Sequence, residues 1–152
     1  MSSVFSLYDR LVEFLSSRWF EGLALLFTRV ALAGVFWRSY KTKVEEGTWF
    51  QISDITYFLF ESEYAGVPLP SDIAAPMATY AEFVFPILLV LGLATRFASA
   101  SLLVMTMVIQ FFVYPEAWWS VHLLWTAMAL VLLSRGAGVF SLDAAIAATR
   151  KS

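Results

Sequence analysis

Two ionisable residues of opposite charge lie inside apolar stretches of this sequence, where a charge is costly. Arg29 occupies the middle of TRVALAGVF, and Glu82 opens the long apolar run from Tyr80 to Arg96. An ionisable residue within a membrane-crossing helix marks a candidate functional site. Counting 1.5 Å per residue from the span ends puts the two charges at similar depth on neighbouring helices, so we predict an Arg29–Glu82 ion pair. Such a pair is either a proton-linked or substrate-binding site or a structural clamp between helices.

A second polar group is expected near one end of these apolar stretches. Gln110 lies near the end of the third stretch, and His122, the single histidine, lies near the start of the fourth. Together with Glu82 they could line a pocket whose flat walls are aromatic: Tyr57, Tyr80, Trp118, Trp119 and Trp125. A quinone would suit such a pocket, because an acid or imidazole can hydrogen-bond a quinone carbonyl and exchange a proton. The alternative is that His122 belongs to an amphipathic belt at the membrane interface.

These patterns define the candidate site. The candidate catalytic residues are Glu82, His122 and Arg29, and the candidate cofactor-binding residues are Gln110, Trp118, Trp125 and Tyr80. No metal site is expected, because the sequence has no metal-ligand spacing; it also lacks a phosphate loop, a dinucleotide fingerprint and a nucleophile elbow.

The composition indicates a membrane protein. Of the 152 residues, 60% are hydrophobic, whereas soluble domains have roughly 45–50%. Only 14% are charged, and these crowd between four apolar runs. The net charge of −2 gives no basic surface for nucleic acid. The absence of cysteine excludes disulfides, iron–sulfur ligation and thiol redox chemistry within this chain.

The four apolar runs predict an all-α fold, a transmembrane four-helix bundle that forms one domain over residues 1–152. The expected spans are about 19–37, 75–94, 97–114 and 117–134, each long enough for a bilayer core of about 30 Å. A mildly amphipathic segment, Met1–Arg18, predicts a short interfacial helix, with a frayed terminus as the alternative. A short helix within Thr48–Phe60 is expected against the bundle mouth, and another is expected after a cap at Ser141.

Charged residues between the spans predict an orientation and some contacts. Both termini are expected in the cytoplasm, because Arg10, Arg18, Arg96, Arg135, Arg150 and Lys151 outnumber Arg38, Lys41 and Lys43 across the membrane. The latter three either bind an anionic group or snorkel and pair with loop acids. A salt bridge between Arg96 and Asp143 is expected to tie a turn to the tail.

The order and spacing of several short motifs resemble the DoxX family of small four-helix membrane proteins. The motifs are Arg29 with Gly34 and the basic Lys41 and Lys43, then Ala81-Glu82, Gly92-Leu93-Ala94-Thr95-Arg96, and the run from Arg135 to Asp143, and they cover about Phe20 to Ala144. Ala137 departs from the family, which often has Pro there, and the aromatic loop after the first span is unusual. The resemblance implies a bacterial inner-membrane protein. Related subunits are tied to quinone-linked oxidation of sulfur compounds, to oxidative-stress or detoxification complexes, or to metal-related peptide maturation.

Two hypotheses follow for function. The first is a quinone-interacting membrane subunit of an oxidoreductase, in which a partner protein brings the electrons. The second is a non-enzymatic scaffold or small transporter in which the buried charges are structural. In both, the chain contacts the lipid bilayer and associates with a partner protein or a second copy, and no nucleic acid is involved.

Overall fold

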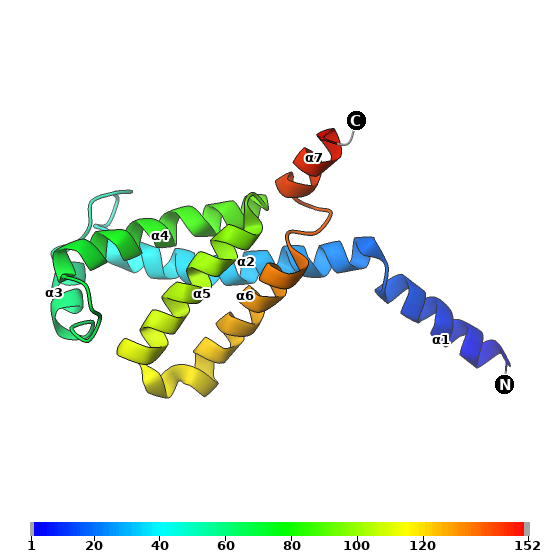
Figure 1. The fold of residues 1–152 in the computed structure, drawn as a ribbon, viewed down its shortest axis with the longest axis horizontal. Coiled ribbons are helices and arrows are strands. Elements are labelled where there is room, and N and C mark those ends of the chain that lie inside the picture. The colour runs from blue at the N-terminus through cyan, green and yellow to red at the C-terminus, as the bar shows by residue number, and fades with distance from the viewer. Residues whose placement is uncertain (1, 151–152) are drawn as a thin grey trace.

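The computed structural model describes residues 2–150, and within that range the chain is all helical apart from turns and loops (Figure 1). The helices are α1 (Ser2–Leu15), α2 (Arg18–Lys43), α3 (Asp54–Ser62), α4 (Ser71–Leu91), α5 (Thr95–Phe112), α6 (Leu123–Arg135) and α7 (Leu142–Thr149). A 3-10 turn, Pro115–Ala117, and a π-helical turn, Trp118–His122, lead into α6. The predicted all-α class is confirmed.

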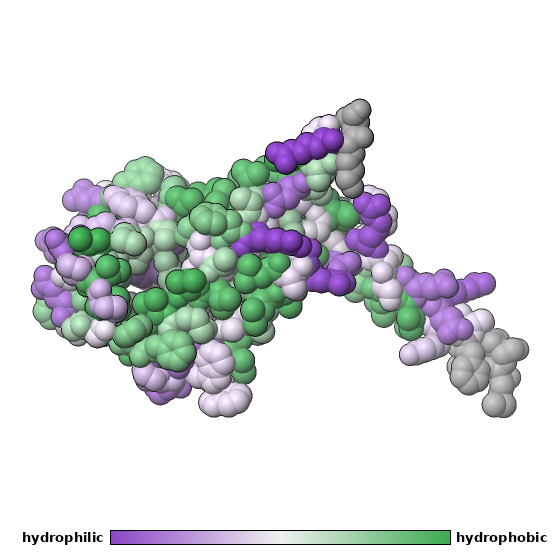
Figure 2. All heavy atoms as spheres, in the orientation of Figure 1, coloured by the Kyte–Doolittle hydropathy of each residue, from purple (hydrophilic) through white to green (hydrophobic). Residues whose placement is uncertain are grey.

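Among the described residues, four helical segments are long and apolar enough to cross a membrane: α2, α4, α5 and Pro115–Arg135. They correspond to the predicted spans, with shifted ends. The largest shift is in α2, which continues from the predicted end at Trp37 to Lys43. Basic residues in its last turn favour this extension, because cations stabilise the negative end of a helix dipole. Figure 2 shows apolar side chains covering the middle of the bundle, with polar residues gathered towards its two ends.

The spanning helices surround an apolar core. The antiparallel pair α2 and α4 packs together, and the hairpin of α5 and α6 packs against both. The core includes Leu32, Phe36, Leu89, Leu102 and Leu132, all of which are buried. In Figure 1, α5 starts beside the end of α4 and diverges from it towards the end of the bundle that carries α3.

The connection between α2 and α4 forms a cap over one end of the bundle. A tight turn after α2 is closed by an isolated antiparallel bridge between Val44 and Ile52. Helix α3 starts at Asp54 because the Ser53 side chain accepts a hydrogen bond from the Thr56 backbone N–H. It packs against α4, as the aromatic segment Thr48–Phe60 predicted. We call residues 54–70, which comprise α3 and the loop to α4, the cap.

The opposite end of the bundle carries both termini (Figure 1). Helix α1 projects away from the start of α2, which confirms the predicted N-terminal helix but leaves its position at a membrane surface as a prediction. The predicted tail helix is also confirmed. The Ser141 hydroxyl accepts a hydrogen bond of 3.1 Å from the Ala144 backbone N–H, and α7 follows.

Candidate functional site

Glu82 is buried, and its partner is Lys43 rather than Arg29. The Lys43 ammonium donates to both carboxylate oxygens, at 2.8 Å to Oε2 and 3.1 Å to Oε1. Ser39 completes the group, since its hydroxyl donates to Oε1 at 3.1 Å and accepts from Lys43 at 2.7 Å. Lys43 and Glu82 are only 6% and 2% exposed. The predicted Arg29–Glu82 pair is therefore wrong, and a residue expected at the membrane surface takes the place of Arg29.

Arg29 binds backbone carbonyl groups instead of a side chain. Its guanidinium donates to the carbonyls of Leu89 and Val90 at 2.9 and 3.1 Å, and to the carbonyl of Phe140. Leu89 and Val90 lie in the last turn of α4, whose carbonyls need partners from beyond the helix. The Leu89 carbonyl also accepts from the Gly92 N–H at 3.1 Å, so the guanidinium adds a second donor to Leu89, supplies one to Val90, and fastens the end of α4 to the segment before α7.

The directions of the side chains explain why Arg29 and Glu82 do not meet. Helical side chains tilt towards the N-terminus of their own helix. Because α2 and α4 are antiparallel, the Arg29 side chain extends towards the α1 end of the bundle, while the Glu82 side chain extends towards the cap. Lys43 lies near the C-terminus of α2, so its long side chain points back into the bundle and reaches Glu82.

Two further residues complete the arrangement around Arg29, which we call the latch (Arg29, Gly92, Asp143 and the carbonyls that they bind). Gly92 has a φ of +65°, and a Cβ there would lie 2.5 Å from the guanidinium nitrogen Nη1 of Arg29. Asp143 accepts hydrogen bonds from the Ala94 and Thr95 backbone N–H groups at 2.8 and 3.0 Å. Its own N–H donates to the Gly92 carbonyl at 2.9 Å.

Asp143 therefore caps the start of α5, where a carboxylate is favoured by the unpaired N–H groups and by the helix dipole. The predicted Arg96–Asp143 salt bridge is wrong. Arg96 instead donates to the Ser134 carbonyl at 3.1 Å, and so ties the start of α5 to the end of α6. The tail is held to the bundle as expected, but through backbone groups.

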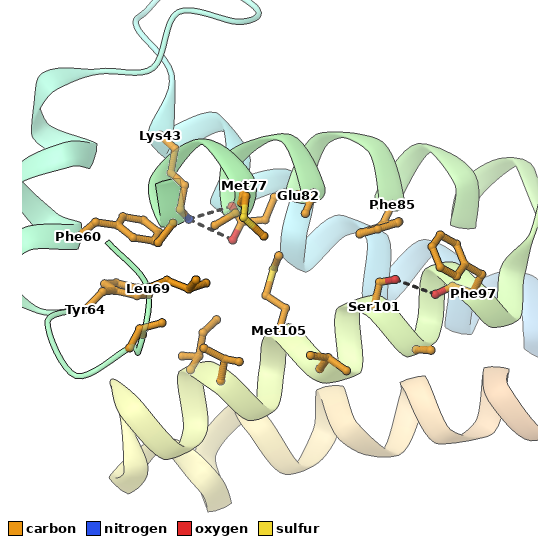
Figure 3. A pocket seen from close by; sticks show the side chains of 18 residues that line it. Lys43, Phe60, Tyr64, Leu69, Met77, Glu82, Phe85, Phe97, Ser101 and Met105 are labelled. Atoms are coloured by element: carbon orange, nitrogen blue, oxygen red, sulfur yellow. Dashed lines mark hydrogen bonds and ion pairs between the residues drawn. The ribbon is translucent and has the colours of Figure 1, made fainter. Parts of the chain in front are cut away.

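A cavity of about 490 Å³ lies beside the Lys43–Glu82 pair, between α4, α5 and the cap (Figure 3). Its volume falls within the roughly 300–1,000 Å³ of typical small-molecule sites. The pair forms the polar end, and Figure 3 shows Phe60, Tyr64 and Met105 around the same space. The remaining lining is almost entirely apolar. The site therefore offers a paired acid and ammonium to a ligand that is otherwise hydrophobic.

Two tyrosines lie where the cap meets the end of α5. Tyr64 stacks on Phe60 with ring centroids 4.4 Å apart, and its burial raises its pKa to about 12. Tyr114, after α5, donates a hydrogen bond to the Glu63 carboxylate, and that bond raises the pKa of Tyr114 to about 12. Both phenols therefore remain neutral hydrogen-bond donors in the physiological range.

Of the predicted site residues, only Glu82 lines the cavity. Gln110 and His122 do meet, as expected, but away from it: His122 Nδ1 lies 2.7 Å from Gln110 Oε1. The Gln110 amide nitrogen donates to the Pro115 carbonyl at 2.8 Å, so its oxygen accepts and His122 is the donor through Nδ1. This pair joins α5 to the π-helical turn. The proposed role of His122 in proton exchange stays a prediction.

The predicted aromatic residues are also placed elsewhere. Trp125 lies between Phe36 and His122, with ring centroids 5.8 and 5.1 Å away, and fills the core. Tyr80 points towards the loop before α3, where its hydroxyl is 3.5 Å from the Phe50 carbonyl. Trp118 is half-buried in the π-helical turn and is not part of the lining. The expected aromatic pocket around Glu82 is instead formed by Phe60, Tyr64 and Phe85.

Lys43, Ser39 and Tyr64 were not predicted as site residues. Lys43 and Ser39 had a signal in the sequence, because Ser39 and Lys43 are four residues apart and would share a face if the first helix continued past Trp37. Tyr64 had none, because its contact with the cavity depends on the path of the cap. Among residues 2–150 there is no group of three or more His, Cys, Asp or Glu side chains that could hold a metal ion.

Comparison with known proteins gives two matches. The family model named DoxX matches residues 24–115, which include α4, α5 and both buried charges of α2. An "uncharacterized protein" of Haemophilus influenzae is 32% identical over 134 residues, covering 83% of this chain and 85% of that protein. No solved structure matches the chain significantly. The family match thus covers the cavity and most of the latch.

Proposed function

The chain belongs to the DoxX family of membrane proteins, and from that premise we propose that it is a quinone-interacting membrane subunit of an oxidoreductase. The binding site is the cavity at Lys43 and Glu82. One observation carries this proposal: an ion pair that is almost fully buried forms the polar end of an otherwise apolar cavity between membrane-spanning helices. Intramembrane charges that face a cavity are typical of functional sites.

The residues around the cavity fit a quinone head group. Aromatic side chains of Phe60 and Tyr64 offer flat apolar walls, and Met77 and Met105 are adaptable neighbours. The Lys43 ammonium binds both oxygens of Glu82, so it can donate to a ligand oxygen while one of these bonds is kept. Glu82 is the group that holds or releases a proton, and Ser39 orients it. A bound quinone would supply the redox chemistry that these side chains lack.

A partner protein completes the proposed assembly. The chain has no cysteine to hold an iron–sulfur cluster and a single histidine, so we expect another protein to deliver the electrons. We place the chain in the bacterial inner membrane with both termini in the cytoplasm, because the basic residues are more numerous on that side. The cap then faces outward.

The alternative function is a scaffold or small transporter, and the same ion pair gives it support. Lys43 and Glu82 join α2 directly to α4 and could act only as a clamp. The two functions differ in what happens when both charges are removed together. A clamp can be replaced by apolar packing, whereas a ligand site loses its polar end.

The test uses the protein in phosphatidylcholine nanodiscs that contain a prenylated benzoquinone. The variant Lys43→Met with Glu82→Leu should fold, because replacing both members of a buried ion pair by apolar residues is often neutral or stabilising by about 1–4 kcal/mol. It should bind quinone at least about tenfold more weakly, a loss of about 1.4 kcal/mol. Lys41→Met is the matched control, since Lys41 is exposed and lies over the Trp49 ring. A folded double variant with unchanged affinity would favour the clamp.

A further inference from the structure

Resting on this proposed function, we propose that the ligand enters the Lys43–Glu82 cavity sideways from the bilayer, between α4 and α5. It follows that the ligand is a lipid-borne molecule with a polar head that has no net charge and a hydrocarbon tail that extends through this opening. Both the route and the class of ligand follow from where the cavity is open and where it is closed.

The cavity opens on the lipid-facing side of the bundle. Four residues that line it are well exposed on the surface: Met77, Phe97 and Val104, with 58%, 64% and 63% of their surface accessible, and Leu69 of the cap, with 47%. The first three belong to α4 and α5, which are both membrane-spanning segments. Val104 lies in the middle of α5, where an exposed side chain faces lipid. A molecule dissolved in the bilayer therefore meets the cavity directly.

The gap between α4 and α5 comes from small side chains and from the divergence of the two helices. Ala78 and Ala81 on α4 face the cavity, as do Ala100 and Ser101 on α5. The helices are joined at the latch end by a short turn that Asp143 binds, and they separate towards the cap (Figure 1). The latch fixes the closed end of this V-shaped cleft, so the opening is part of the fold and needs no movement.

The cap covers the cavity at the wide end of the cleft. Phe60, Tyr64, Val67 and Leu69 all come from the cap and all line the cavity (Figure 3). The loop lies directly on the end of α5, since a Cβ at Gly66 would be 3.0 Å from the Phe112 carbonyl oxygen. Contacts between Tyr114 and the cap residues Glu63 and Tyr64 hold it there. Of the four lining residues from the cap, Phe60 is buried, Tyr64 and Val67 are half-buried and Leu69 is exposed, so the route from water is the more covered of the two.

The charges select among lipid-borne molecules. Lys43 is already matched by Glu82 at 2.8 Å, so an anionic head group would add an unpaired charge at a buried site, which is strongly unfavourable. A neutral head that accepts a hydrogen bond adds no charge. The apolar lining towards Phe97 then suits a hydrocarbon tail. A prenylated quinone has both features, whereas a phospholipid with an anionic head has only the tail.

The experiment compares blocking of the side opening with locking of the cap. Val104→Phe enlarges a side chain in the opening, and Val84→Phe is its matched control, because Val84 is also exposed on a spanning helix but does not line the cavity. The cap is locked by joining Glu63→Cys to Tyr114→Cys with a short bismaleimide. The natural chain has no cysteine, so only this link forms. The probe is an azido-substituted prenylated benzoquinone in phosphatidylcholine vesicles, and the rate of covalent photolabelling after mixing is measured.

Side entry predicts that Val104→Phe slows labelling several-fold, while Val84→Phe and the locked cap leave the rate unchanged. A tail-free azidobenzoquinone should label far less. The reverse pattern, with slowing by the locked cap and none by Val104→Phe, would overturn the side route while leaving the binding site in place. A wild-type protein that is not labelled at all would overturn the proposed function and this inference together.

Discussion

The two buried cations of α2 bind different kinds of partner. Arg29 donates to main-chain carbonyls at the end of α4 and before α7, whereas Lys43 donates to a carboxylate and a hydroxyl. The surroundings of Arg29 are filled, since not even a Cβ fits at Gly92. The surroundings of Lys43 include a cavity. A buried charge in a membrane helix is thus a sign of either assembly or binding, and its partners and the adjacent space decide between the two.

The largest effect is expected from Arg29→Met. This change removes the side-chain donor to the Val90 and Phe140 carbonyls, and each acceptor left unpaired in a buried site costs roughly 1–3 kcal/mol. The free energy of unfolding in mixed micelles measures it. No second side-chain substitution should restore stability, because the partners are backbone groups. A rescuing side-chain change would contradict the distinction between the two cations.

Lys43→Met alone should be similarly destabilising, because it leaves Glu82 buried without its counter-charge, at a cost of about 3–5 kcal/mol. Here a second change should restore stability. Adding Glu82→Leu removes the remaining charge. The free energy of unfolding of the double variant should therefore be close to that of the wild type. Denaturant titration of the two variants side by side tests this. A double variant no more stable than Lys43→Met would contradict the view that the unpaired Glu82 carboxylate causes the loss.

Gly92→Ala tests the close packing of the latch. The added Cβ would lie 2.5 Å from the Arg29 guanidinium and 3.0 Å from the Ser141 Cα, so the substitution should cost more than the roughly 1–2 kcal/mol of a left-handed conformation alone. Gly47→Ala is the matched control. Gly47 also has a positive φ, +79°, but a Cβ there meets nothing within 4 Å. Equal losses of unfolding free energy for the two variants would show that the space around Arg29 is not limiting.

The smallest effect is expected at alkaline pH, where the cap meets the end of α5. The pKa values of Tyr64 and Tyr114 are raised to about 12 in the folded protein, above their ordinary value near 10. Their contribution to stability is therefore fully present below about pH 10 and is lost as the pH rises through about 12. The temperature of thermal unfolding of the wild type should fall more steeply across this pH range than that of the Tyr64→Phe, Tyr114→Phe variant. Parallel profiles would show that the cap does not hold these phenols neutral.

Much of the fold could be predicted because its signals are local. Apolar runs gave the spanning helices, and Ser141 marked the start of α7 as a capping residue. The end of the first span was less predictable, since polar residues follow Trp37 and apolar content gives no reason to continue the helix. That boundary placed Lys43 in a loop, and its role was missed for this reason.

The candidate site was predicted only in part, because it depends on side-chain direction and on distant packing. Glu82 was correctly expected to be buried with a cation, but depth counted from helix ends paired it with Arg29. The tilt of side chains towards each helix N-terminus would have separated those two. Gln110 and His122 lie away from the cavity, and predicting this would have required knowing how α5 and α6 pack.

We expect the ligand site at Lys43 and Glu82 and not at the pair formed by Gln110 and His122. The most direct measurement is mass-spectrometric mapping of an azido-substituted prenylated benzoquinone photolabelled into the wild-type protein. We predict covalent labels on cavity residues of α4 and α5, such as Met77 and Met105, and their loss in the Lys43→Met, Glu82→Leu variant. Labels concentrated around Trp118, His122 and Trp125, or an unchanged pattern in that variant, would contradict the assignment.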